Sequence, residues 1–137
     1  MSQENKAIVR RAIEEVWNKR NPAAIDEIYA ANYVIHNPPG GISPNREGLK
    51  QWVSMVLAAF PDTHWTVEDQ IAEGDKVVTR LTIRSTHTGE FMNIPSTGKQ
   101  VVVTAITISR IERGKIQEGW ANWDALGMMQ QLGTVSR

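Results

Sequence analysis

The stretch KQVVVTAITISRIERGKIQEGWANWD, residues 99–124, decides the fold class. Two runs rich in β-branched and apolar residues, 99–112 and 115–124, flank the dipeptide Arg113-Gly114. Glycine supplies the positive φ that a tight hairpin needs, so the two runs are expected to pair as antiparallel strands. Both exceed the mean strand length of about 5–6 residues, which predicts a long, bent sheet.

Helical patterns precede the strands along the chain instead of alternating with them. Apolar residues at helical spacing between Asn45, a favoured N-cap, and Pro61, which stops a helix, predict the clearest helix. Further helical patterns occupy residues 3–19 and the segment after Pro22, and further strands are expected over 64–72 and 76–88. A last short helix is expected to turn inward Leu126, Met129 and Leu132.

This segregation of helices from strands is typical of an α+β fold. We expect one domain, residues 1–137, in which a cone-shaped, curved antiparallel sheet wraps around the N-terminal helices. Such a cone is expected to enclose an apolar pocket for a small molecule.

Composition narrows the function classes. Lysine plus arginine number 15, as do aspartate plus glutamate, which gives no sign of a nucleic-acid or membrane-surface partner. The longest apolar run, 55–60, is far shorter than the about 20 residues of a membrane span. The absence of cysteine excludes disulfides, thiolate metal ligands and thiol nucleophiles. We expect a cytoplasmic protein.

The last strand carries the strongest candidate for chemistry. Strand alternation predicts that one face is polar and aromatic, as in a ligand cavity, and carries Ile116, Glu118, Trp120, Asn122 and Asp124. The other face would carry Gln117, Gly119, Ala121 and Trp123. Asp124 has two interpretations: the N-cap of the last helix, or a general acid/base beside Trp120. Spacing alone favours the cap.

Histidines and aromatic residues supply further candidates. His87 is expected on the strand face of Ile83, inside the cone, as a catalytic hydrogen-bond donor or a structural core histidine. His36 and the nearby Tyr33 are expected at the pocket mouth. No local pair of metal ligands occurs, so we predict no metal site. On the helical stripe, pocket lining is expected alongside core packing for Trp52 and Phe60.

Several strings together resemble one family. Phe60-Pro61-Asp62 closes the clearest helix, residues 86–91 (THTGEF) lead through 94–99 (IPSTGK) into the next strand, and residues 114–116 (GKI) open the last one. With Glu118, Trp120 and Asp124, followed by residues 131–133 (QLG), this combination resembles the SnoaL-like polyketide cyclase (ester cyclase) family of the nuclear transport factor 2-like superfamily.

The resemblance implies a cone fold and an intramolecular aldol cyclisation without cofactor or metal. Asp124 matches the position of the family's acid/base, so the resemblance favours a functional Asp124 over a mere cap. The implied ligand is a small apolar or aromatic compound with carbonyl groups, related to a polyketide.

Two other functions are compatible with the same fold. The same cone is expected to suit a non-catalytic binding module for an apolar metabolite. Epoxide hydrolysis on this fold would be expected to use an Asp-Arg-Asp arrangement, and no Arg-x-Asp occurs in the expected strands.

Trp123 and several Thr and Val residues, expected on the outer face of the sheet, predict a homodimer through that face.

Overall fold

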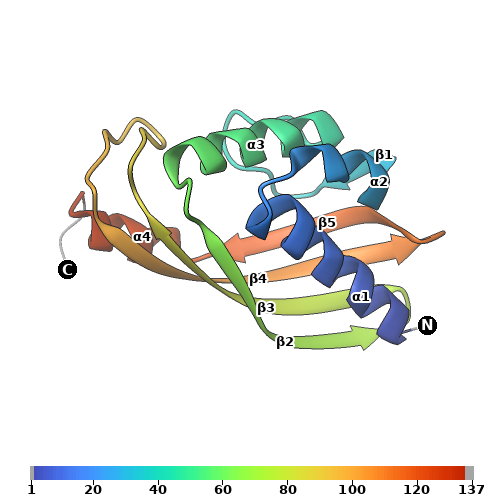
Figure 1. Ribbon diagram of the computed structural model, residues 1–137. Coiled ribbons are helices and arrows are strands. Elements are labelled where there is room, and N and C mark those ends of the chain that lie inside the picture. The colour runs from blue at the N-terminus through green and yellow to red at the C-terminus, as the bar shows by residue number, and fades with distance from the viewer. Residues whose placement is uncertain (1, 135–137) are drawn as a thin grey trace.

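The computed structural model describes residues 2–134 as helices packed on a five-stranded sheet (Figure 1). The helical elements are α1 (Ser2–Ala12), a π-helical turn (Ile13–Asn18), a 3-10 turn (Pro22–Ala24), α2 (Ile25–Ile28), α3 (Arg46–Ala59) and α4 (Ala125–Leu132). The strands are β1 (Tyr29–Ile35), β2 (His64–Glu73), β3 (Lys76–Thr86), β4 (Gln100–Glu112) and β5 (Lys115–Trp123).

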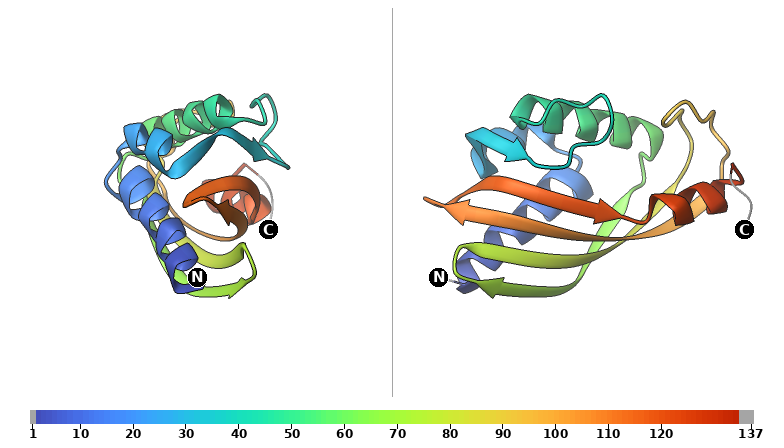
Figure 2. Two further views of the ribbon diagram at one scale, coloured as in Figure 1. Left: turned by 90° about the vertical axis from the view of Figure 1, so that its right-hand side faces the viewer. Right: turned by 180° about the vertical axis from the view of Figure 1, so that it is seen from behind.

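The strand order is β1-β5-β4-β3-β2, with β2 to β5 antiparallel and β1 parallel to β5. Figure 2 shows the sheet bending around the layer formed by α1 and α3, with α4 at the far end of the sheet from the start of α1. The predicted α+β cone is confirmed, and the core lies between the helices and the concave face.

Burial on that concave face holds the layers together. Ile25, Val53, Leu81 and Ile116 come from four different elements and are at most 1% exposed. Burying one such side chain is worth about 1.5–3 kcal/mol. None of the helices within residues 2–134 is long and apolar enough to span a membrane.

The ends of α3 follow the sequence signals. The side chain of Asn45 accepts a hydrogen bond from the backbone N–H of Gly48 at 2.9 Å, and the helix ends just before Phe60 and Pro61. The first helix differs from the expected 3–19, because residues 13–18 widen into a π-helical turn. That turn aims Trp17 at Trp65 of β2, and the two rings stack with centroids 4.1 Å apart.

The predicted faces of the last strand are wrong beyond Ile116. Ile111 pairs with Ile116, whereas the preceding Arg110 pairs with Glu118, so Gln117 is an extra residue in a β-bulge. A bulge of one residue exchanges the faces of everything after it. Ile116 therefore points inward together with Gly119, Ala121 and Trp123, and the residues on the opposite, outer face are Glu118, Trp120 and Asn122.

Candidate functional site: an aromatic cavity

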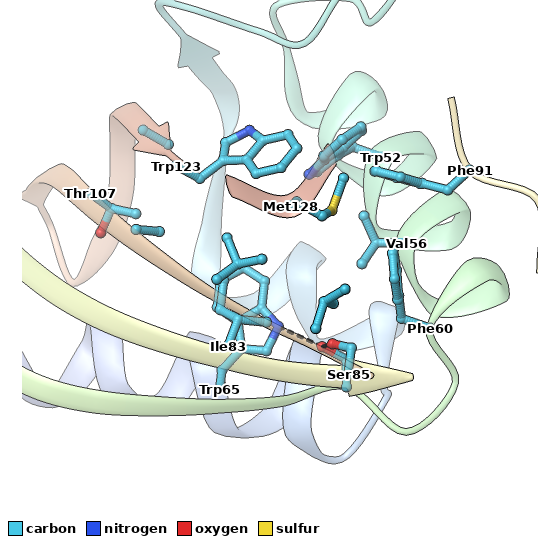
Figure 3. Close-up of a pocket in the computed structure, with 15 residues that line it drawn as sticks. Trp52, Val56, Phe60, Trp65, Ile83, Ser85, Phe91, Thr107, Trp123 and Met128 are labelled. Carbon is cyan, nitrogen blue, oxygen red and sulfur yellow. Dashed lines mark hydrogen bonds between the residues drawn. The ribbon is translucent and has the colours of Figure 1, made fainter. Parts of the chain in front are cut away.

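An aromatic cavity lies between α3, α4 and the concave face of the sheet (Figure 3). It measures about 670 Å³ with its open mouth included. Fifteen residues line it: Trp52, Val56, Phe60, Thr63, Trp65, Ile83, Ser85, Phe91, Val101, Val103, Ala105, Thr107, Ala121, Trp123 and Met128.

A second cavity of about 950 Å³, measured in the same way, adjoins the first toward α1 and β1. The two share lining residues, among them Trp52, Trp65 and Trp123. Tyr33 and Gly119 border the second cavity, and a Cβ on Gly119 would lie 2.5 Å from the Tyr33 hydroxyl. Glycine is thus needed here for the close approach of the phenol to β5.

Polar groups on the wall of the first cavity are few and concentrated. The indole N–H of Trp65 donates to the Thr63 hydroxyl at 3.1 Å, and the hydroxyls of Thr63 and Ser85 lie 2.8 Å apart. Thr63 and Ser85 are both buried. The third hydroxyl on the wall, that of Thr107, belongs to β4 and takes no part in this cluster.

Asp124 stands where β5 ends and α4 begins. Its carboxylate accepts a hydrogen bond from the backbone N–H of Gly127 at 2.9 Å, which makes it the N-cap of α4. The residue is exposed and lies outside the lining of both cavities. Its neighbours on the chain do line the first cavity: Trp123 precedes it, and the backbone N–H of Met128 donates to its carbonyl oxygen at 3.1 Å.

His87 is fully buried beside the cavity wall. The backbone N–H of Thr97 donates to its Nδ1 at 3.3 Å, and the Thr97 hydroxyl lies 2.9 Å from the same nitrogen. Because a backbone amide can only donate, Nδ1 is the acceptor and the neutral ring carries its proton on Nε2. Among the described residues Nε2 has no hydrogen-bond partner. The ring packs 5.3 Å from the ring of Phe60, which lines the cavity.

His36 and Glu118 meet beside β1, outside both cavity linings. His36 Nε2 lies 2.6 Å from a Glu118 carboxylate oxygen, and the His36 ring stacks on Trp120 at 4.5 Å. Arg110 also pairs with Glu118, and these two partners, Arg110 first, lower the pKa of that carboxyl. Asn122 is exposed and lines neither cavity, whereas Trp120, although it belongs to the outer face of β5, also borders the second cavity.

The structure brings together three of the predicted aromatic residues. Trp52 lines both cavities, Phe60 the first and Tyr33 the second. Sequence reasoning missed Trp65, Ser85, Phe91, Trp123 and Met128. Ser85 had a signal, because it lies between Ile83 and His87 at strand spacing. Phe91 had none, because it lies in the irregular connection between β3 and β4. Within residues 2–134, no three His, Cys, Asp or Glu side chains gather as a metal site requires.

Several known structures share this architecture. The chain superimposes on TsrD of Streptomyces laurentii with a TM-score of 0.89 at 26% identity, over 98% of both chains. IdmH of Streptomyces antibioticus, described as a candidate polyketide cyclase, gives 0.81 at 34% identity over 94% of this chain and 98% of its own. A candidate polyketide cyclase of Acidithiobacillus ferrooxidans gives 0.87 at 30% identity over 99% of both chains. Among curated protein sequences, no match is found.

The fold and its aromatic cavity define a member of the nuclear transport factor 2-like class. Within that class, the chain belongs to the SnoaL-like polyketide cyclase family, whose model matches residues 7–132. The predicted family and fold are both confirmed.

Proposed function

We propose that the protein is a cofactor-free cyclase or isomerase that closes a ring in a polyketide-like carbonyl compound by intramolecular aldol condensation. The observation that carries this proposal is the aromatic cavity with Asp124 between two lining residues, Trp123 and Met128, along the chain. Family membership and the likeness to IdmH support the same reaction class.

In the proposed reaction, the Asp124 carboxylate removes a proton from a carbon flanked by carbonyls. The enolate then attacks a second carbonyl carbon of the same molecule, which forms the new C–C bond and an alkoxide. The protonated carboxyl returns its proton to that alkoxide, so the proton balance closes without a co-reactant. Such acid–base help contributes about 10²–10⁴-fold, and holding the folded substrate conformer adds to it.

Two further groups enter the proposal as hydrogen-bond donors. Burial raises the pKa of the Tyr33 hydroxyl well above its usual value, and the neighbouring Tyr29 raises it further. Tyr33 therefore stays protonated at physiological pH and suits a donor toward an oxyanion in the second cavity. His87 would donate through its Nε2–H, which has no partner among residues 2–134. It would do so when the Phe60 ring moves aside or a substrate group reaches the nitrogen.

The test is hydrogen–deuterium exchange at the activated carbon of a bicyclic β-ketoester, methyl 1-tetralone-2-carboxylate, followed by NMR in deuterated buffer. The proposal predicts that the wild-type protein accelerates exchange above the buffer rate and that Asp124→Asn loses at least 100-fold of this acceleration, the lower bound for a general base. Equal rates for the two proteins would remove Asp124 from the mechanism.

The alternative is a non-catalytic binding module for an apolar metabolite. The exposed position of Asp124 as the N-cap of α4 favours it, because capping alone accounts for an aspartate there. The same experiment separates the two functions. Binding of the β-ketoester in the cavity, with exchange at the buffer rate, would establish the binding module.

We also propose that the protein forms a homodimer through the outer face of the sheet. Trp123 does not contribute to that face, because the bulge in β5 turns it inward. A row of apolar residues does cross four strands on that face, and neighbouring residues pair along it: Ile71, Val78, Ile108 and Trp120. The side chains of Ile71 and of Ile106, which lies next to Ile108 on the same face, are 64% and 50% exposed, and a second copy of the chain would cover them. Light scattering should give a dimer mass for the wild type and a monomer mass for Ile106→Glu.

A further inference from the structure

The cluster of Thr63, Trp65 and Ser85 is the polar spot of a wall that is otherwise almost entirely apolar. It contains three protons that can be donated: one on the Trp65 indole nitrogen and one on each hydroxyl. The indole N–H can only donate, and it donates to Thr63. The remaining contact joins the two hydroxyls.

Counting donors against acceptors leaves one proton over. Whichever hydroxyl donates across the 2.8 Å contact, the other hydroxyl keeps its proton. Among residues 2–134 neither hydroxyl makes a further side-chain hydrogen bond. A donor left unmatched in a buried apolar site is costly, so the cavity favours a ligand that brings one acceptor to this spot.

The direction of the two bonds selects Thr63. Its hydroxyl oxygen accepts from both the Trp65 indole N–H and the Ser85 hydroxyl, so the free proton is that of Thr63, and accepting two bonds strengthens Thr63 as a donor. Ser85 is a lining residue on the opposite side of the cavity from Trp123 in Figure 3. A ligand bonded to Thr63 would extend from the wall near Ser85 toward Trp123 and the neighbouring Asp124.

We propose that Thr63, aligned by Trp65 and Ser85, donates a hydrogen bond to a carbonyl oxygen of the bound ligand and so selects aromatic ketones over hydrocarbons of the same shape. The inference rests on the proposed function only in placing the ligand in this cavity. It assigns Thr63 a role in specificity, whereas Asp124 is the group proposed for proton transfer.

The test uses a matched pair of probes, 1-tetralone and tetralin, which differ by one carbonyl oxygen. Their dissociation constants are measured by quenching of the intrinsic tryptophan fluorescence. One neutral hydrogen bond corresponds to about a three- to tenfold change in affinity. Thr63→Val should weaken 1-tetralone by that factor and leave tetralin unchanged. Thr104→Val, which removes an exposed hydroxyl that lines neither cavity, is the matched control and should change neither.

Tetralin binding also reports whether each variant has kept its fold. A measurement that needs no variant is the infrared carbonyl stretch of 1-tetralone on the wild-type protein, which should lie below its frequency in an aprotic solvent. An unshifted stretch, or an equal loss of both probes in Thr63→Val, would overturn the role of Thr63. The proposed reaction fails separately, if Asp124→Asn exchanges deuterium as fast as the wild type. Failure of the wild type to bind either probe would overturn both.

Discussion

The carboxylate of Asp124 accepts the backbone N–H of Gly127 at 2.9 Å, so the residue that we propose as acid/base also caps α4. The bond uses Oδ1, and the other carboxylate oxygen has no hydrogen-bond partner within residues 2–134. A cap bond of this kind fixes the orientation of the carboxylate at the end of β5. The structural and the proposed catalytic roles are therefore compatible, and substitutions can separate them.

Asp124→Asn and Asp124→Ala should differ in stability but not in activity. Asparagine caps helices about as well as aspartate, so the free energy of unfolding should change little, whereas alanine should cost about 1 kcal/mol. Both variants lack the base and should lose the accelerated deuterium exchange. Urea denaturation and NMR measure the two properties. An Asn variant as active as the wild type would leave Asp124 with the cap alone.

Asn18→Ala should weaken the attachment of the first helical layer to the sheet. The Asn18 side-chain amide donates to the backbone carbonyl oxygen of Trp65 at 2.9 Å and accepts from the backbone N–H of Trp65 at 2.7 Å. These are the two backbone groups that a neighbouring strand would otherwise bind. Losing both bonds at a partly buried site should lower the free energy of unfolding by about 1–3 kcal/mol. Gln51→Ala, an exposed amide on α3, is the control and should have little effect.

Gly119→Ala should destabilise the protein through one clash that a second substitution removes. The new Cβ would lie 2.5 Å from the Tyr33 hydroxyl oxygen but 3.4 Å from the ring carbon that bears it. We expect a cost of about 1–3 kcal/mol from this overpacking. Tyr33→Phe deletes the clashing oxygen and should restore most of that loss in the double variant. Additive losses in urea denaturation would show that the crowding lies elsewhere.

Stability at low pH should depend on Asp62. The backbone N–H and the hydroxyl of Thr86 donate to the Asp62 carboxylate at 2.7 and 2.6 Å. These bonds, that of the hydroxyl most of all, lower the pKa of Asp62 below 3.8. A lowered folded-state pKa contributes stability that is complete above the unfolded-state value and is lost as pH falls through the folded-state value.

Asp62→Asn should therefore show a shallower loss of unfolding free energy below about pH 4 than the wild type. The difference should be modest, because the carboxyl is exposed and solvent screens it. Urea midpoints at a series of pH values measure it. Parallel curves for the two proteins would show that the Thr86 bonds do not persist in solution.

Much of the fold could be predicted because local signals agreed with the tertiary structure. Asn45 and Pro61 bracket α3, and Gly114 marks the turn between β4 and β5, where its φ is +74°. Long strands following helices were enough to predict the cone. The predicted roles of Trp52 and Phe60 as lining residues followed from the same helical stripe that packs the core.

The faces of β5 could not be predicted, because a bulge at Gln117 leaves no mark in an alternating pattern. One extra residue moved Trp123 from the expected outer face into the cavity. In α4 the buried residues are Met128 and Leu132, whereas Leu126, expected inside, is 60% exposed. The cap at Asp124 and the packing of α4 on β4 set which face of α4 points inward. The apolar periodicity of only eight residues does not determine that face.

A crystal structure of the protein with methyl 1-tetralone-2-carboxylate would show whether Asp124 reaches a ligand in the first cavity. We predict that the bicyclic ring lies there among Trp52, Phe60 and Trp123, with the activated carbon about 3–3.5 Å from an oxygen of Asp124. A ligand bound outside this cavity, or within it with the activated carbon beyond reach of Asp124, would exclude Asp124 as the base.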